Sequence, residues 1–393
     1  MNQRLTIWQV GEHPRALGGI EQNLLALAHG LRRRGHRQAL VHRADEPVDS
    51  DWKAAFDALH PVAEETDLER LAETHPPDVI VVQRPFEPWM IRKLLAMGPV
   101  VRVVHDHDLV CPRRHKYFPL SQAICARPAG FACLAHGCFI GRGADGGLTV
   151  NSVRERLDDI AAHHFVDRLI VASRFMRDEL AQNGLHPERI HILPPLPGEV
   201  RLTPMPYPVE EDMVLFVGQL IRGKGVDLLL EALAKLVHPW RCVVAGSGNM
   251  RPELEWMAQR LGIADRVQFL GRLSHDETMD LYGRAAVIAV PSRWPEPFGM
   301  VGIEAMAAAR PIVAFRVGGI PEWLWHGVNG LAAPATDVGE FARLLDWLLA
   351  DKKLAVDLGA NGRKLFEERY GFAPYIDAFE NILFQTVASR GVA

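Results

Sequence analysis

The chain has 393 residues, a length that suits two domains better than one compact core. Hydrophobic residues make up 48% and charged residues 23%, as in globular proteins, and the formal net charge of -4 argues against general electrostatic binding of nucleic acid. The acidic excess lies after residue 195, whereas 14 of the 17 histidines lie before it. We therefore expect the two halves to do different work.

The beginning of the chain and its cysteines favour a cytosolic protein. The first apolar stretch is short and is predicted to form a strand rather than a signal peptide. No apolar run approaches the roughly 20 residues that span a bilayer. Five cysteines, an odd number, favour a reducing compartment over a disulfide scaffold. We expect a cytoplasmic location, either free or at the inner face of the membrane.

Short β-branched runs alternate with amphipathic segments along the chain. Because these runs are continuously apolar, they predict parallel strands that are covered on both faces, and residues 20–34 show helical spacing of apolar residues. The alternation predicts an α/β fold of two facing, Rossmann-like doubly wound domains with a cleft between them. The predicted strands, in chain order, are Leu5–Val10, Val79–Gln83, Val100–His105, Leu169–Ala172, Val214–Val217, Cys242–Ala245, Val267–Leu270, Val287–Val290 and Pro311–Phe315.

Prolines mark the predicted domain boundary. The run that begins at Pro194 and continues to Pro208 is too stiff to extend a helix or a strand. We predict an N-terminal domain of residues 1–197, a linker of residues 198–212 and a C-terminal domain of residues 213–371. The amphipathic end of the chain, 372–393, is predicted to form a helix that crosses back to the first domain.

The segment 291–307 carries the strongest functional pattern. It follows an apolar strand, so it lies at the carboxyl edge of a sheet, where open α/β folds bind ligands. A helix is predicted to begin near Met300, and free N–H groups at a helix start suit a diphosphate. Glu304 falls about one turn into this helix, within reach of two vicinal ribose hydroxyls. The alternative is that Glu296 and Glu304 are ordinary surface carboxylates.

Glu296 and Glu304 resemble the Glu-x7-Glu motif of the retaining nucleotide-sugar glycosyltransferases with the GT-B fold (family 4 type). The resemblance extends to the loop 218–225, which looks like Gly-Arg-Leu-x-x-x-Lys-Gly, and to the glycine turn 245–248. It also includes the strand end 269–273 and the glycine loop 18–21 of the first domain. It implies transfer of a sugar from a nucleoside diphosphate sugar to an acceptor hydroxyl, with retention and without a metal or other catalytic cofactor.

The resemblance also implies roles for individual residues. Glu296 would face the donor sugar and Lys224 would neutralise the departing diphosphate, while His105, at the end of a strand, would lie near the donor sugar in the cleft. The catalytic residues expected in this way are His105, Glu296, Lys224 and Arg222. The expected donor-binding residues are Gly18, Gly19, Gln219, Gly246, Gly271, Leu273, Phe298, Gly299, Met300, Val301 and Glu304.

Gln219 departs from the family pattern, which has arginine there. An arginine pairs strongly with phosphate, and glutamine lacks that charge. Either Arg222 supplies the missing cation, or the protein is a weakened or non-catalytic nucleotide-sugar binder. A GT-B epimerase or phosphorylase is a further alternative, whereas a dehydrogenase is disfavoured because no strand leads into Gly-x-Gly-x-x-Gly.

Four cysteines lie in one loop-like segment after His105. Cys111, Cys125, Cys133 and Cys138 have the spacing C-x13-C-x7-C-x4-C. Four thiolates would form a closed structural zinc site, although the spacing is unusual for zinc and unmetallated thiols or disulfides are the alternatives. The segment is expected to line the acceptor side.

Two basic runs lie in the first domain. The run 32–37 ends a helix, where the helix dipole favours cations. The run 113–116 lies beside the expected acceptor site, where either an anionic acceptor or a peripheral contact with a membrane surface would suit it.

Overall fold

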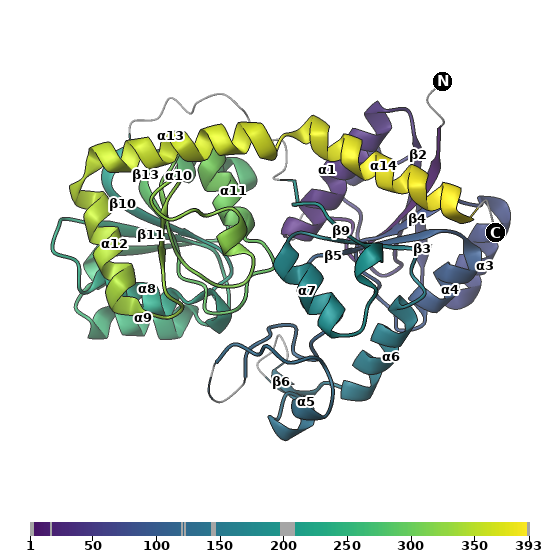
Figure 1. The fold of residues 1–393 in the computed structure, drawn as a ribbon, viewed down its shortest axis with the longest axis horizontal. Coiled ribbons are helices and arrows are strands. Elements are labelled where there is room, and N and C mark those ends of the chain that lie inside the picture. The colour runs from purple at the N-terminus through teal and green to yellow at the C-terminus, as the bar shows by residue number, and fades with distance from the viewer. Residues whose placement is uncertain are drawn as a thin grey trace.

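The computed structural model describes residues 4–15, 18–118, 121, 123–142, 147–196 and 209–390. Two α/β lobes lie side by side, and the helices at the end of the chain run along one side of both (Figure 1). Most of the predicted linker, up to residue 208, lies outside the described residues.

The first lobe contains a parallel seven-stranded sheet with the strand order β3-β2-β1-β4-β5-β8-β9. Because the order reverses beside β1, the ends of β1 and β4 diverge and leave a crevice at the carboxyl edge of the sheet. The strands are β1 (Thr6–Val10), β2 (Arg37–Arg43), β3 (Ala58–Val62), β4 (Val79–Val82), β5 (Val100–Val104), β8 (Arg168–Val171) and β9 (Ile190–Ile192).

Helices cover both faces of this sheet. On one face α1 and the C-terminal helix α14 share a core with β1, β4 and β5, while the other face shares a core with α3, α4, α6 and α7. The helices of this lobe are α1 (Gly19–Arg33), α2 (Ser50–Ala55), α3 (Glu65–Thr74), α4 (Met90–Met97), α5 (Phe131–Ala135), α6 (Val153–His163), α7 (Arg174–Gln182) and α14 (Phe372–Arg390).

The second lobe repeats the arrangement with a parallel six-stranded sheet of order β12-β11-β10-β13-β14-β15. Its strands are β10 (Glu210–Val217), β11 (Arg241–Ala245), β12 (Val267–Gly271), β13 (Ala285–Val290), β14 (Ile312–Phe315) and β15 (Leu331–Ala333). Its helices are α8 (Val226–Leu233), α9 (Arg251–Arg260), α10 (His275–Arg284), α11 (Met300–Ala307), α12 (Val338–Ala350) and α13 (Lys352–Arg369).

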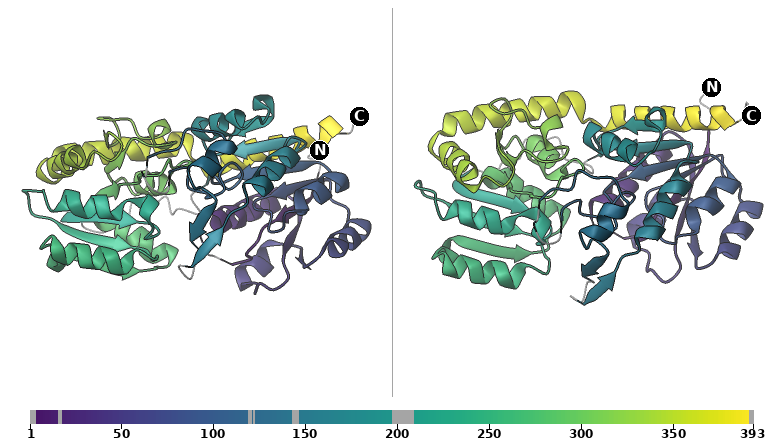
Figure 2. Two further views of the ribbon diagram at one scale, coloured as in Figure 1. Left: turned by 90° about the horizontal axis from the view of Figure 1, so that it is seen from below. Right: turned by 60° about the horizontal axis from the view of Figure 1, so that its bottom comes forward.

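The segment between β5 and α6, residues 109–151, is an insertion in the first lobe. It contains α5 and a small antiparallel hairpin of β6 (Ile140–Arg142) and β7 (Leu148–Val150), and it projects from the lobe (Figures 1 and 2). The ammonium group of Lys116 anchors it, because this side chain is 1% exposed and its Nζ lies 2.7 Å from the Glu179 carboxylate of α7.

The predicted fold class is confirmed by two Rossmann-like parallel sheets, and all nine predicted strands are present. The helix predicted for 20–34 is α1. The strands that the sequence did not predict are β2, β3, β6, β7, β9 and β15. Of these, β2 carries the buried polar residues Gln38 and His42. The buried Gln38 side chain is satisfied on both sides, because its oxygen accepts from Gln9 Nε2 at 2.7 Å and its Nε2 donates to the Ala28 carbonyl at 2.7 Å. In the described part of the chain, no helix is long and apolar enough to cross a membrane.

Candidate active site between the two sheets

The carboxyl ends of β10, β11, β12 and β13 lie along one edge of the second sheet and hold the predicted donor site. Three glycines meet there: the Gly246 N–H donates to the Gly271 carbonyl at 2.8 Å, and a Cβ on Gly246 would overlap the Gly218 carbonyl oxygen. The structure thus brings together the predicted residues Gly246 and Gly271, which are 25 positions apart in the sequence, at the loop that begins with Gly218. Gln219 beside them is exposed, and Leu273 is half-buried.

The loop 291–299 is held in place by backbone packing against glycine. Gly225 has a φ of 70°, and a Cβ there would overlap the Pro291 carbonyl oxygen. Gly318, with a φ of 55°, lies equally close to the Glu296 backbone, and the Gly319 N–H donates to the Glu296 carbonyl at 2.7 Å. The conformation of this loop therefore requires glycine in two other loops.

Lys224 and Glu296 form the central ion pair of this site. Lys224 Nζ donates to Glu296 Oε1 at 2.7 Å, and the Ser292 hydroxyl donates to the same oxygen at 2.5 Å. The Glu296 side chain is 6% exposed and that of Lys224 is 23% exposed. Lys224 Nζ also lies 4.9 Å from the centroid of the Trp294 ring. Because the carboxylate is buried but the ammonium is partly open, the cation remains accessible to an anionic ligand.

Glu304 lies on α11, which begins at Met300 as predicted. Its Oε2 accepts a hydrogen bond from the Tyr282 hydroxyl of α10 at 2.7 Å. Burial raises the pKa of Glu304, and the hydrogen bond from Tyr282 opposes that rise. Phe298 is buried, and its carbonyl accepts a hydrogen bond from the Trp323 indole N–H at 2.6 Å. This bond holds the backbone just before α11 in place. Gly299, Met300 and Val301 are half-buried at that start.

Arg222 lies two residues before Lys224 but turns toward other partners. Its guanidinium is 3.2 Å from Glu253 and 3.4 Å from Asp227, and its side chain is 38% exposed. Asp227 also pairs with Arg293 at 2.5 Å. Arg222 is therefore close to the loop 291–299, which we call the donor loop, but its charge is shared with two carboxylates.

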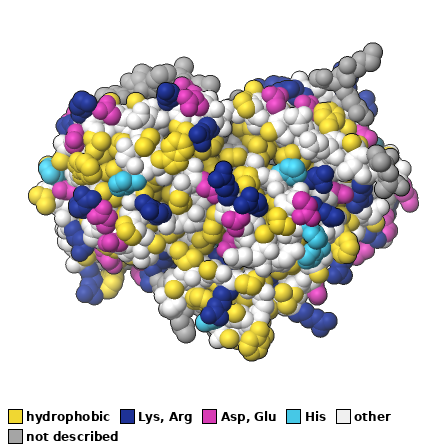
Figure 3. Space-filling view, viewed as in Figure 1, with side chains coloured by type: hydrophobic (Ala, Val, Ile, Leu, Met, Phe, Trp, Pro, Cys, Tyr) yellow, Lys and Arg dark blue, Asp and Glu magenta, His cyan; other side chains and the backbone are white. Residues whose placement is uncertain are grey.

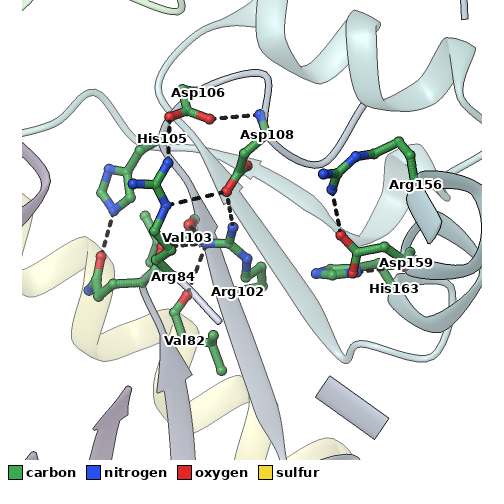
Figure 4. A network of polar contacts seen from close by, with 11 residues as sticks. Val82, Arg84, Arg102, Val103, His105, Asp106, Asp108, Arg156, Asp159 and His163 are labelled. Atoms are coloured by element: carbon green, nitrogen blue, oxygen red, sulfur yellow. Dashed lines mark hydrogen bonds and ion pairs between the residues drawn. The ribbon is translucent and has the colours of Figure 1, made fainter. Parts of the chain in front are cut away.

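In the first lobe, His105 follows β5 and contacts Gln83 at the end of β4. Its Nε2 lies 2.7 Å from Gln83 Oε1 (Figure 4). Since an amide oxygen only accepts, Nε2 is assigned the proton and Nδ1 is left as an acceptor. Burial, with the nearby Arg102 and Arg84 charges, lowers the pKa of His105 to about 3, so the ring is neutral at physiological pH.

Two arginines and two aspartates form a network beside His105. Arg84 contacts Asp106 at 3.1 Å and Asp108 at 3.8 Å, and Arg102 contacts Asp108 at 3.1 Å (Figure 4). Burial and the neighbouring Asp108 carboxylate raise the pKa of Asp106 to about 6. The network stiffens the turn after β5 and leaves one of its carboxyl groups able to titrate close to neutral pH.

A cavity of about 760 Å³ opens at the same edge of the first sheet. Arg84 and Asp108 of the network line it, together with residues after β1 and on α4 and α6. Other residues of its wall are Glu12, Arg92, Arg114, Glu155, Arg156 and Asp159. This position, beside His105 and outside the strand ends, suits a polar second substrate.

His107, rather than His105, is the histidine that contacts the second lobe. Its Nε2 lies 2.8 Å from the Pro295 carbonyl in the donor loop. Burial lowers the pKa of His107 to about 4, so the neutral ring donates through Nε2. Ser173, at the start of α7, donates to the Pro297 carbonyl at 2.5 Å. The two lobes therefore meet at the loop that carries Glu296, which sequence reasoning did not predict.

The glycine loop of the first lobe is described only in part. Gly18 precedes α1 and has extended backbone, and a Cβ on Gly19 would meet no atom within 4 Å. These two glycines therefore leave open space at the helix start.

The four clustered cysteines lie near one another. Burial and the neighbouring thiols raise the pKa of Cys138 to about 11, and burial also raises the pKa of Cys133. Among the described residues, which include all four of these cysteines, no three His, Cys, Asp or Glu side chains are arranged to hold a metal ion. The structure does not assemble the predicted zinc site, which stays a prediction that metal analysis of purified protein can test.

The buried histidines predict that the protein loses stability in mild acid. Burial lowers the pKa of His105 to about 3 and those of His107 and His115 to about 4, whereas each takes up a proton near pH 6.5 when unfolded. Between pH 6.5 and 4 the folded state therefore binds fewer protons, and the free energy of unfolding falls as the pH falls.

Asp106 and Glu304 have raised pKa values and act in the opposite sense, but three histidines outweigh two carboxyls. The expected net loss is about 1 kcal/mol per pH unit, since each fully coupled proton contributes at most about 1.4 kcal/mol per unit. Urea unfolding at pH 7.5 and pH 5.5 measures it. An equal or higher stability at pH 5.5 would contradict this assignment of protons.

Comparison with known proteins matches both lobes to glycosyltransferase families. Residues 17–196 match "Glycosyltransferase Family 4" and residues 205–365 match "Glycosyl transferases group 1". An uncharacterized glycosyltransferase of Methanocaldococcus jannaschii is 29% identical over 95% of this chain and 94% of its own length. The D-inositol 3-phosphate glycosyltransferase of Mycobacterium tuberculosis is 37% identical, but over only 47% of this chain and 41% of that protein.

Solved structures share the fold over nearly the whole chain. The Anabaena protein HepE, crystallised with UDP, has a TM-score of 0.74 at 19% identity and covers 97% of this chain and all of its own. Sucrose-phosphate synthase of Thermosynechococcus elongatus has a TM-score of 0.74 at 20% identity over 98% of this chain and all of its own. The chain thus joins a Glycosyltransferase Family 4 domain to a Glycosyl transferases group 1 domain in a single GT-B fold.

Proposed function

We propose that this protein transfers a sugar from a nucleoside diphosphate sugar to an acceptor hydroxyl, with retention at the anomeric carbon. The observation that carries the proposal is the contact of Lys224 with Glu296 beside the start of α11, because it places a cation, a carboxylate and free N–H groups at one sheet edge. HepE, which shares the fold, has been crystallised with UDP and with UDP-glucose. Uridine diphosphate sugars are therefore the first donors to test.

Each group of the donor site has a separate task in this proposal. Glu304 holds the ribose hydroxyls, the N-terminus of α11 receives the diphosphate and Glu296 faces the sugar hydroxyls. Lys224 neutralises charge on the departing diphosphate, where charge grows in the transition state, so no metal is needed for that role.

The proposed transfer needs no side chain to act as a general base. The bond from the anomeric carbon to the diphosphate oxygen breaks, and the bond to the acceptor oxygen forms on the same face of the sugar. The acceptor hydroxyl loses its proton to the departing phosphate. His105 stays neutral, and its Nδ1 accepts a hydrogen bond from a donor hydroxyl while Gln83 fixes the ring.

The cavity of the first lobe is the proposed acceptor site. It lies next to the network that supports His105, and closure of the lobes around both substrates would exclude water and limit donor hydrolysis. Its wall carries carboxylates and guanidinium groups together, which suits an acceptor rich in hydroxyls and other polar groups.

Arg222 is proposed to supply the second cation that Gln219 lacks. Its charge is divided between Glu253 and Asp227 in the ligand-free site, and a diphosphate would compete for it. Arg222→Ala is expected to lower kcat about tenfold or more, as loss of a charged hydrogen bond does. Steady-state kinetics with Arg260→Ala, on the exposed side of α9, serves as the matched control. Unchanged kinetics in Arg222→Ala would rule this compensation out.

A panel of nucleotides and nucleotide sugars in a thermal-shift assay tests the donor part of the proposal. A ligand that binds only the folded state raises its apparent stability, and Glu304→Gln should abolish most of that shift. A non-catalytic nucleotide-sugar binder is the second candidate, favoured by the exposed Gln219. Tight donor binding without nucleotide release across an acceptor panel would favour the binder.

A further inference from the structure

The insertion 109–151 differs in charge from the rest of the protein. It contains five Lys or Arg residues and one acidic residue, so it carries a net charge of +4 in a chain whose total is -4. The remaining residues therefore carry a net charge of -8. The insertion projects away from both sheets (Figures 1 and 2). A positive projection on a negative protein is a feature that the transfer chemistry does not explain.

The end of this insertion is covered with exposed apolar side chains. Phe131 is 83% exposed and Val150 is 86% exposed, and Ile124, Leu134 and Ile140 are exposed as well. We call these five residues the apolar tip. They make up five of the fifteen large hydrophobic side chains that are exposed among the described residues, although the insertion is about a tenth of the chain.

The apolar tip has two ordered parts. Phe131 and Leu134 are three positions apart on α5 and share one face of that helix. Ile140 and Val150 are paired directly across the β6–β7 hairpin, so their side chains lie on the same face. None of the five residues of α5 is buried, so this short helix gives no side chain to the core. In the space-filling view, apolar side chains gather at the lowest part of the molecule, with Lys or Arg side chains beside them (Figure 3).

The insertion carries exposed cations in addition to the apolar tip. Arg114 and Arg127 are exposed and form no ion pair with any described residue. Arg113 lies with its guanidinium 5.7 Å from the centroid of the Tyr117 ring. On α6, Asp158 and Asp159 each face an arginine of the same helix, and Glu155 lines the cavity. The insertion therefore combines a net positive charge with exposed apolar side chains.

We propose that the apolar tip and its arginines dock the protein on a membrane surface made of anionic phospholipid. Apolar side chains at the headgroup level, combined with nearby Lys and Arg, are the combination that binds such surfaces reversibly. Arg114 lies both in the insertion and in the wall of the cavity, so docking brings that cavity to the bilayer. The proposal is independent of the transfer reaction, because membrane binding is measured without donor or acceptor.

Flotation of the full-length protein with vesicles tests this docking. Vesicles of phosphatidylcholine and phosphatidylglycerol in equal parts are compared with vesicles of phosphatidylcholine alone. We expect the wild type to float with the anionic vesicles, and Phe131→Ser with Val150→Ser to weaken binding about tenfold or more. The matched control is Trp256→Ser with Val237→Ser, two exposed apolar side chains of the second lobe.

Charge is tested separately by Arg114→Gln with Arg127→Gln. Each lost cation should weaken binding to anionic vesicles roughly fivefold. The control is Arg37→Gln with Lys235→Gln, which are exposed elsewhere. No flotation with anionic vesicles would overturn the proposal, and so would equal losses in the control pairs. A concentration-dependent dimer that Phe131→Ser with Val150→Ser abolishes would also overturn it, because a second copy would then cover the tip. Circular dichroism confirms that each variant is folded.

Discussion

Replacing Lys224 by methionine is expected to lower kcat about 100- to 1000-fold. Its ammonium group is the partly open cation of the donor site, 2.7 Å from Glu296 and able to reach a diphosphate. Removing a single preorganised group that stabilises developing charge typically costs about that factor in rate. Methionine retains the length and apolar stem of lysine, so packing against Trp294 is largely kept. Nucleotide release in a steady-state assay measures the change.

Loss of Lys224 also leaves the buried Glu296 carboxylate with the Ser292 hydroxyl as its one remaining hydrogen-bond partner among the described residues. A loss of stability must therefore be separated from a loss of catalysis. Glu296→Gln together with Lys224→Met removes both charges and should regain stability but not turnover. Lys235→Met, at an exposed position of the same lobe, should behave as the wild type. A kcat within threefold of the wild type in Lys224→Met would show that this lysine does not stabilise the departing group.

Replacing Glu304 by glutamine is expected to weaken donor binding about 10- to 100-fold while changing kcat much less. A carboxylate accepts hydrogen bonds from two vicinal hydroxyls, whereas the glutamine side chain has one acceptor oxygen. Hydrogen bonds to a charged group are worth about 1.5–3 kcal/mol, which is the size of this effect. Calorimetric titration with the nucleoside diphosphate measures the binding affinity directly.

Tyr282→Phe is the matched control for Glu304. It removes the hydroxyl that donates to Glu304 Oε2 but keeps the carboxylate, so the expected loss of affinity is smaller. Because burial raises the pKa of Glu304 and the hydrogen bond from Tyr282 opposes that rise, Tyr282→Phe should also shift the acid limit of nucleotide binding to higher pH. Equal affinity in Glu304→Gln and the wild type would remove this residue from the ribose site.

The sequence predicted the parts of the site that depend on local pattern. Apolar runs locate the strand ends, and the loop after Val287–Val290 locates Glu296 and the start of α11, because parallel strands place their carboxyl ends at one edge. The partners of these residues could not be predicted in the same way. Tyr282 lies on another helix, 22 positions before Glu304, and no local pattern joins them.

The contacts between the lobes could not be predicted from the sequence either. Sequence reasoning favoured His105, yet His107 is the histidine that reaches the donor loop, at Pro295. His105 and His107 lie in the turn after β5 and face different partners. The contacts of Arg84, Asp106 and Asp108 set the conformation of this turn, so strand periodicity does not predict where each ring points. Gln83 was predicted to be the last residue of a strand. Its hydrogen bond with His105 could not be predicted, because it depends on the register between β4 and β5.

The insertion also has features that the sequence could not predict. Cysteine spacing suggested a zinc site, whereas the structure brings the thiols near one another without the convergence that a metal needs in the part of the chain it describes. The exposure of Phe131 and Val150 follows from the projection of the insertion and could not be inferred from their residue type alone.

Product analysis by proton NMR measures whether the protein transfers a sugar with retention. The full-length protein is incubated with an α-linked uridine diphosphate sugar and a panel of hydroxyl acceptors, and both the released nucleotide and the anomeric proton of the product are followed. We expect nucleotide release that depends on an acceptor, a product with the α configuration, and loss of both with Lys224→Met. A β-linked product, or tight binding with no release across the panel, would contradict this expectation.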